Sequence, residues 1–317
     1  MNHCGSKDSD MKQEIRIGTR GSALALWQAE WVKAQLRRLW PFLTVDLVTI
    51  KTSGDTIQDV SLSTIGGKGL FVKEIEEALL AGSIDLAVHS MKDVPGELPA
   101  GLTISAVPER EDPRDVLITK HGETLAGLPA GTRVGTSSLR RQALLLALNP
   151  GLRVEMLRGN VDTRLRKQRE GVVDATVLAA AGLKRLGITP EHSCVLDDQE
   201  FLPAIGQGAL GVETRAEEEL LRLVQPLHHR ETATAVNAER AFLQRMGGSC
   251  RTPLAAQGTV STGTMRLRAL VASPDGQRVI RGELSGTVDE AHQIGSALAE
   301  FLLARGGKEI LEGLKIG

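Results

Sequence analysis

The chain has 317 residues, which is too long for one ordinary hydrophobic core and predicts two or three domains. Its 41% hydrophobic and 24% charged residues, with no apolar run long enough to cross a bilayer, exclude a disordered chain and a membrane protein. Lys and Arg (38) nearly balance Asp and Glu (39), and aromatic residues make up only 3%, which argues against a general nucleic-acid-binding surface.

The first 13 residues are polar and lack the apolar core of a secretory signal, so we expect a disordered tail on a cytoplasmic protein. The three cysteines, Cys4, Cys194 and Cys250, are odd in number and far apart, which favours free thiols in a reducing compartment. Cys250 lies in the glycine-flanked stretch MGGSCRTPL. Its simplest explanation is a small buried hydrophobic side chain.

The first hundred residues predict strands alternating with helices. Strands are expected over 14–18, 44–50 and 84–90. After the first strand, Ser22 is placed as the N-cap of a helix. The apolar stripe of that helix comprises Leu24, Trp27, Trp31 and Ala34. A second helix is expected to end at Gly82, and its stripe comprises Phe71, Ile75, Ala78 and Leu79.

The same alternation resumes after the charged stretch 108–115, which we interpret as a hinge. Strands are expected over 132–135, 152–157 and 173–181, with helices over 137–148, 160–168 and 182–187, and a second crossing over 199–208. The pattern predicts an α/β fold with mostly parallel sheets.

From about residue 231 the pattern changes and predicts a smaller α+β domain. It begins with one long helix, followed by strands around the turn 273–276. A final helix through Ile294, Leu298 and Phe301 is expected to end at Gly306 and Gly307.

Cationic and hydroxyl side chains recur where a predicted strand ends and a helix begins. In open α/β sheets these junctions meet at one crevice, and helix N-termini already attract anions. A salt bridge would explain any one of the arginines, but their repetition favours a polyanion as the ligand. The residues are Arg20, Ser22, Lys92, Thr136, Ser137, Ser138, Arg140, Arg141, Arg158 and Arg164.

Other motifs give weaker indications of function. GQGALG at 206–211 follows no clean strand, which disfavours a dinucleotide site, and IGGKGLF at 65–71 lacks two residues of a P-loop. The latter is either a plain flexible loop or a mobile lid carrying Lys68 and Phe71. His228 and His229 have no metal ligands at suitable spacing, so no metal site is expected. A catalytic Cys–His pair stays open, because such partners meet only in space.

Nine stretches in chain order resemble the porphobilinogen deaminase family. They are GTRGSALALWQ, GGKGLFVKEIE, AVHSMKDVP, EREDPRD, GTSSLRRQ, LRGNVDTRL, AGLKRLG, PAIGQGALGVE and GGSCRTP. The resemblance implies a transferase of haem biosynthesis that joins four porphobilinogen molecules head to tail into hydroxymethylbilane and releases ammonia. It also implies two lobes of the type II periplasmic-binding-protein kind and a third α+β domain. We expect domain 1 over 14–108 and 203–226, domain 2 over 109–202 and domain 3 over 227–317.

By this resemblance Cys250 carries one covalent dipyrromethane cofactor per chain through a thioether, and Asp93 is the catalytic acid. From the residues alone, Asp93 would be a helix cap or a partner of Lys92. The cationic and hydroxyl residues named above, together with Lys68 and Gln207, fall at cofactor-binding or substrate-binding positions, and Phe71 falls in a lid. We also expect a monomer, and direct handover of its product to the next enzyme of the pathway stays open. The alternative is a two-lobed ligand-binding protein without chemistry.

Overall fold

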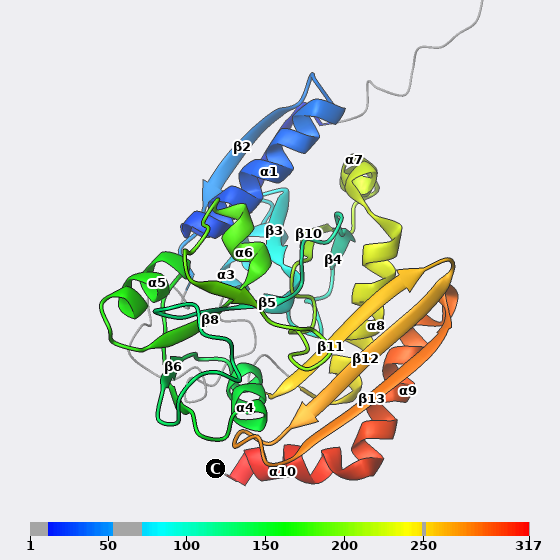
Figure 1. Cartoon of the computed structure of the whole chain (residues 1–317). Helices are drawn as coiled ribbons and strands as arrows, with labels where there is room; N and C mark the ends of the chain where they lie inside the picture. The colour runs from blue at the N-terminus through cyan, green and yellow to red at the C-terminus, as the bar shows by residue number, and fades with distance from the viewer. Residues whose placement is uncertain (1–11, 53–71, 249–251, 317) are drawn as a thin grey trace, which may run out of the picture.

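The computed structural model describes residues 12–52, 72–248 and 252–316. Within them lie two five-stranded sheets, each flanked by helices, and one three-stranded sheet with helices on one side (Figure 1). The expected class, an α/β protein with a smaller α+β part, is confirmed.

The first lobe is built on the sheet β2-β1-β3-β10-β4. Its strands are β1 (Glu14–Thr19), β2 (Thr44–Thr49), β3 (Leu86–Ser90), β4 (Leu102–Ala106) and β10 (Leu210–Arg215). Its helices are α1 (Ala23–Leu39), α3 (Lys73–Leu80) and α7 (Glu218–Val224). Strand β1 pairs in parallel with β2 and β3, whereas β10 is antiparallel to both of its neighbours.

The second lobe repeats this plan in the sheet β7-β6-β8-β5-β9. Its strands are β5 (Asp115–Ile118), β6 (Arg133–Gly135), β7 (Arg153–Glu155), β8 (Ala175–Ala179) and β9 (Ser193–Val195). Its helices are α4 (Leu139–Leu148), α5 (Val161–Arg169) and α6 (Ala180–Arg185). In each sheet the fourth strand arrives from the other lobe and pairs antiparallel.

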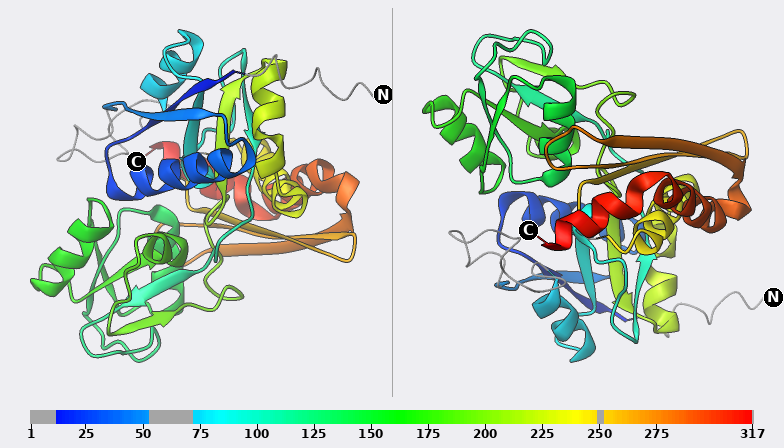
Figure 2. Two further views of the ribbon diagram at one scale, coloured as in Figure 1. Left: turned by 90° about the horizontal axis from the view of Figure 1, so that it is seen from above. Right: turned by 90° about the horizontal axis from the view of Figure 1, so that it is seen from below.

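The third part consists of an antiparallel sheet that packs against two helices. The sheet joins β11 (Leu254–Ser261), β12 (Thr264–Ala272) and β13 (Val279–Thr287), and α8 (Arg230–Arg245) and α9 (Ala291–Leu302) cover one face. Figure 2 shows the sheet running alongside both lobes. The turn at its end packs on α4, because a Cβ on Gly276 would lie 2.5 Å from the Ala147 nitrogen.

Two expectations about helices were wrong in part. The final helix was expected to end at Gly306 and Gly307. Instead the helical path kinks at Gly306, where φ is 104°, and continues as α10 (Lys308–Ile316). In α9 the buried positions are Ile294, Leu298 and Leu302, whereas Phe301 is 47% exposed.

Helix α1 also turns a different face to its sheet than expected. Its buried side chains include Ala29, Val32 and Leu36, and of the predicted stripe Trp31 packs against this core whereas Trp27 is exposed. Trp27 instead faces the second lobe, where the Arg185 guanidinium lies 6.0 Å from the centre of its ring. Part of the predicted stripe therefore serves the contact between lobes.

The two crossings between lobes lie side by side. The Glu111 nitrogen donates to the Gly208 oxygen at 3.2 Å, and the Arg110 side chain donates to the Gln207 oxygen at 2.8 Å. Glu239 of α8, which is fully buried, accepts hydrogen bonds from Arg110 and from the Gly206 nitrogen. The third part is thereby fastened to both crossings.

The chain start departs slightly from the expected tail. Lys12 Nζ lies 2.8 Å from Asp85, and the Gln13 oxygen accepts a hydrogen bond from the Thr44 nitrogen at 2.8 Å.

We propose the domain boundaries given above for the rest of the chain, because each proposed segment coincides with one of the three sheets. No described helix is long and apolar enough to span a membrane.

Candidate active site

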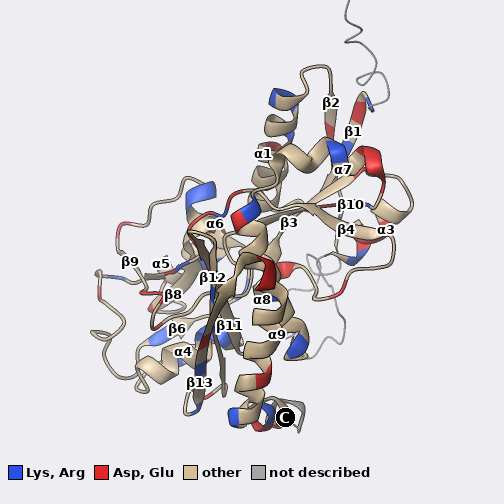
Figure 3. Cartoon of the chain, turned by 90° about the vertical axis from the view of Figure 1, so that its right-hand side faces the viewer, with Lys and Arg blue, Asp and Glu red and all other residues tan. Residues whose placement is uncertain are grey.

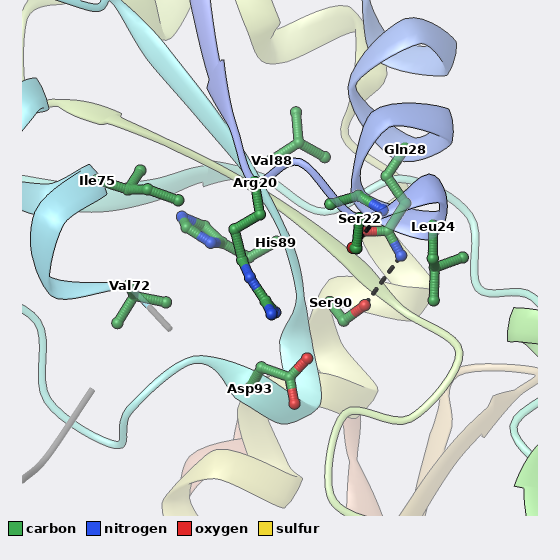
Figure 4. A pocket seen from close by; sticks show the side chains of 11 residues that line it. Arg20, Ser22, Leu24, Gln28, Val72, Ile75, Val88, His89, Ser90 and Asp93 are labelled. Carbon is green, nitrogen blue, oxygen red and sulfur yellow. Dashed lines mark hydrogen bonds between the residues drawn. The ribbon is translucent and has the colours of Figure 1, made fainter. Parts of the chain in front are cut away.

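A small pocket lies where β1 and β3 end and α1 begins (Figure 4). Arg20, Ser22, His89 and Asp93 are among the side chains that line it, and in Figure 4 the Arg20 side chain points towards Asp93. Ser22 is the N-cap of α1, as expected, because its side chain accepts a hydrogen bond from the Ala25 nitrogen at 3.3 Å. The pocket therefore combines a cation, a hydroxyl group and a carboxylate at one strand-to-helix junction.

Asp93 lies exposed at the end of the single 3-10 turn Met91–Asp93. The next residue, Val94, is extended, so Asp93 begins no helix and the interpretation as a helix cap is wrong. Its charge instead raises the pKa values of two cations, Lys92 and Arg164, against the effect of their burial. The carboxylate thus sits within electrostatic reach of cations from both lobes.

The cations around Asp93 are only partly neutralised. Burial, with a further contribution from the charge of Arg141 and against the effect of Asp93, lowers the pKa of Lys92 to about 8. Burial likewise lowers the pKa of Arg164 to about 10, with Arg141 and Arg158 adding to the effect. Among the described residues no carboxylate lies within ion-pair distance of Lys92, Arg158 or Arg164. An anionic ligand would relieve this repulsion.

Arg158 has the most open hydrogen-bonding capacity. Its Nε and Nη2 atoms are buried, and neither has an acceptor in the described part of the chain. Buried donors without a partner are rare in folded proteins, because each loses its hydrogen bond to water. Within residues 12–52, 72–248 and 252–316, Arg158 Nε and Nη2 therefore remain open to an acceptor such as a ligand carboxylate.

Arg140 and Arg141 differ from the other cations in being paired. Both are buried, with 4% and 6% of their surface exposed, and both bind the carboxylate of Asp115 at 2.7 Å. Gln207, another predicted site residue, donates to the same carboxylate at 3.0 Å. Sequence reasoning missed Asp115, although it closes the EREDPRD motif. The charge of these two arginines is therefore partly compensated by a protein carboxylate.

The hydroxyl residues shape the start of α4. Ser138 is its N-cap and accepts a hydrogen bond from the Arg141 nitrogen at 3.4 Å. Thr136 Oγ1 accepts one from the Ser138 nitrogen at 3.2 Å, and Ser137 between them is half-buried. These hydroxyl groups hold the turn that precedes Arg140 and Arg141.

Cys250, Lys68 and Phe71 lie outside the described residues.

Sequence reasoning also missed a buried acidic group behind the pocket. His89 Nε2 lies 2.8 Å from Glu213 Oε2, and both side chains are buried. Glu76 is 9% exposed, and among the described residues one oxygen of Glu76 and one of Glu213 have no hydrogen-bond partner. These residues lie at ordinary helix and strand positions, so no sequence signal marked them.

Taken together, the fold and the site define a two-lobed α/β protein with a cationic site for a polyanionic ligand at the ends of its strands. Lys and Arg are otherwise interspersed with Asp and Glu over most elements (Figure 3). The local gathering of cations, and not a high overall charge, marks the site.

Comparison with known proteins gives the family. A family model described as porphobilinogen deaminase, dipyrromethane cofactor binding domain, matches residues 15–222, and the C-terminal domain model matches residues 233–304. The porphobilinogen deaminase of Syntrophotalea carbinolica is 57% identical over 95% of this chain and 96% of its own length. The porphobilinogen deaminase of Geobacter sulfurreducens is 54% identical over 94% of this chain and 93% of its own length. The chain belongs to the porphobilinogen deaminase family, enzymes of tetrapyrrole biosynthesis with a dipyrromethane cofactor.

Likeness to solved structures is much looser. The aliphatic sulphonate binding protein SsuA from Escherichia coli gives a TM-score of 0.39 at 16% identity, covering 74% of this chain and 70% of that one.

The buried Glu76 predicts a pH-dependent stability. Burial raises its pKa from 4.5 to about 7, with Glu213 adding to the shift and His89 opposing it. Between these pH values the folded chain holds a proton that the unfolded chain has released, so stability falls as pH rises from 4.5 to 7. Relative to Glu76→Gln, the free energy of unfolding of the wild type should decrease by on the order of 3 kcal/mol between pH 4.5 and 8.

Urea unfolding of both proteins across this pH range measures the difference. Glu77→Gln is the control, because Glu77 is exposed and pairs only loosely with Lys73 at 3.8 Å. If the difference in free energy of unfolding between wild type and Glu76→Gln is the same at both ends of the pH range, the raised pKa of Glu76 is contradicted.

Proposed function

We propose that this enzyme joins four porphobilinogen molecules head to tail into hydroxymethylbilane, with loss of one ammonia per coupling. The growing chain starts on one dipyrromethane held by a thioether at Cys250. The single observation that carries this proposal is the partly neutralised cationic cluster, in which two buried nitrogens of Arg158 have no hydrogen-bond partner among the described residues.

The residues present suit such a cofactor. Each porphobilinogen unit carries an acetate and a propionate, so a chain of them brings many carboxylates into one site. Arg158 and Arg164 would hold carboxylates from the second lobe, and Arg20 and Lys92 from the first. A guanidinium can bind a carboxylate through two parallel hydrogen bonds, which fixes its orientation as well as its charge.

Asp93 is proposed to promote the chemical step. In each coupling the bond between the methylene carbon and the amino nitrogen of porphobilinogen breaks, and the electron pair leaves with ammonia. The methylene carbon then bonds to the free α-carbon of the terminal pyrrole, which loses a proton. Asp93 can hydrogen-bond to the departing ammonium group and stabilise the positive charge left on the substrate. Its exposed position beside the pocket supports this role.

A covalent primer supplies a fixed end on which the chain grows and keeps intermediates from diffusing away. Holding both reactants in one site makes each coupling effectively intramolecular. The chain leaves α8 through Gly247, three positions before Cys250 in the sequence, and its φ of 62° favours glycine.

The mass of the protein tests the proposal directly. Wild-type protein from cells able to make porphobilinogen should be heavier than its sequence by one dipyrromethane, and Cys250→Ala should have the mass of its sequence. Intact mass spectrometry of both distinguishes the enzyme from a ligand-binding protein. A wild-type chain of unmodified mass would contradict the proposal.

The role of Asp93 predicts a large loss of rate without a loss of structure. Asp93→Asn removes the charge and the proton-transfer capacity, so turnover should fall by about 10²- to 10⁴-fold. The melting temperature should stay near wild type, because the side chain is exposed. Asp93→Glu should lie between the two.

The measurement is single-turnover release of ammonia by protein already carrying its cofactor, so that faulty primer assembly is not mistaken for faulty chemistry. Near-normal release by Asp93→Asn would remove Asp93 from the mechanism.

A further inference from the structure

Asp115 is a fully buried carboxylate placed between two arginines of the proposed binding site. It begins β5, directly after the first crossing between the lobes. Arg141 donates to its Oδ1 through both Nε, at 3.2 Å, and Nη2, at 2.7 Å. Arg140 Nη2 lies 2.7 Å from Oδ2. Gln207, from the second crossing, donates to Oδ1 at 3.0 Å.

These contacts keep Asp115 charged despite its burial. The two guanidinium groups lower its pKa to about 2, more than offsetting the opposite effect of desolvation. The group of Arg140, Arg141 and Asp115 therefore carries one net positive charge in place of two. Both arginines still lower the pKa of Lys92 from across the lobes, so part of their field reaches the site.

Asp115 offers the arginines the same chemical group as the ligand. A carboxylate of the growing chain meets guanidinium groups that already interact with the protein, because Arg141 donates to Asp115 through Nε and Nη2, and Arg140 is in ion-pair contact with Asp115 while its Nη1 donates to the Leu202 oxygen. The ligand carboxylate gains less binding free energy from Arg140 and Arg141 than it would from arginines without a protein partner. Part of its interaction only replaces the one that the arginines already make with Asp115. Arg140 Nε, which is buried and has no partner in the part of the chain that the structure describes, remains available.

We propose that Asp115 is an internal counter-anion that competes with ligand carboxylates for Arg140 and Arg141 and thereby sets how tightly the site holds them. This inference rests on the proposed function. A chain that lengthens at each coupling must shift its carboxylates along the site. Binding that is equally tight before and in the transition state lowers KM without raising kcat, and it would hinder this movement.

The test compares Asp115→Asn with wild type in the full chain, produced in cells unable to make porphobilinogen so that neither carries the cofactor. Succinate, a small dicarboxylate, is the probe, and its dissociation constant is measured by calorimetry. Asp115→Asn should bind succinate about 10-fold more tightly or better, because a unit charge a few ångströms away is no longer compensated. Equal or weaker binding overturns the proposal.

Asp112→Asn is the matched control. Asp112 belongs to the same charged segment, but it pairs with the exposed Arg114 at 2.6 Å. Its replacement should leave the affinity for succinate unchanged. A comparable gain in Asp112→Asn would mean that general charge, and not competition at the two arginines, governs binding, and would overturn the proposal.

If Asp115→Asn does not fold, the same comparison is made in the background of Arg140→Gln. There the remaining pair of Arg141 and Asp115 is neutral, and adding Asp115→Asn leaves one free guanidinium. The double variant should again bind succinate more tightly than Arg140→Gln alone, and equal or weaker binding overturns the proposal.

Turnover by the cofactor-loaded proteins separates competition from simple structural support. Loss of the competitor should lower both KM for porphobilinogen and kcat, whereas loss of a structural support would raise KM. A raised KM in Asp115→Asn therefore overturns the proposal. The succinate measurement does not require turnover, so failure of the proposed function would show separately, as wild-type protein without turnover.

Discussion

The site depends on holding several like charges together without enough carboxylates to neutralise them. Lys92, Arg158 and Arg164 have no ion-pair partner among the described residues, and Asp115 compensates only part of the charge of Arg140 and Arg141. Such an arrangement costs folding free energy, because buried cations repel one another and lose hydration. The rest of the structure must supply that free energy and fix the positions of the cations.

Two features of the fold meet this requirement. Each lobe has its own buried core, and in each the cations follow strands whose ends lie at one edge of the sheet. The two crossings are hydrogen-bonded to each other, and Glu239 fastens them to the third part through the Gly206 and Gly258 nitrogens. The geometry of the site thus depends on contacts that are distant in the sequence.

The sequence predicted most elements and the main composition of the site. Alternating strand and helix periods identified both lobes, and cations at strand-to-helix junctions predicted an anion site there, because these signals are local. The buried face of α1 was assigned wrongly, since Trp27 looks like a core residue but packs towards Arg185 of the other lobe. Asp115 and the pair of His89 and Glu213 were missed because their roles arise only when separate segments meet.

We propose that Lys92, Arg158 and Arg164 hold carboxylates of the cofactor and substrate. A crystal structure of the protein carrying its cofactor tests this most directly at Arg158. The account predicts a cofactor carboxylate oxygen within hydrogen-bond distance of Arg158 Nε or Nη2. If both nitrogens instead contact only protein groups or water while the cofactor carboxylates lie elsewhere, the account is contradicted.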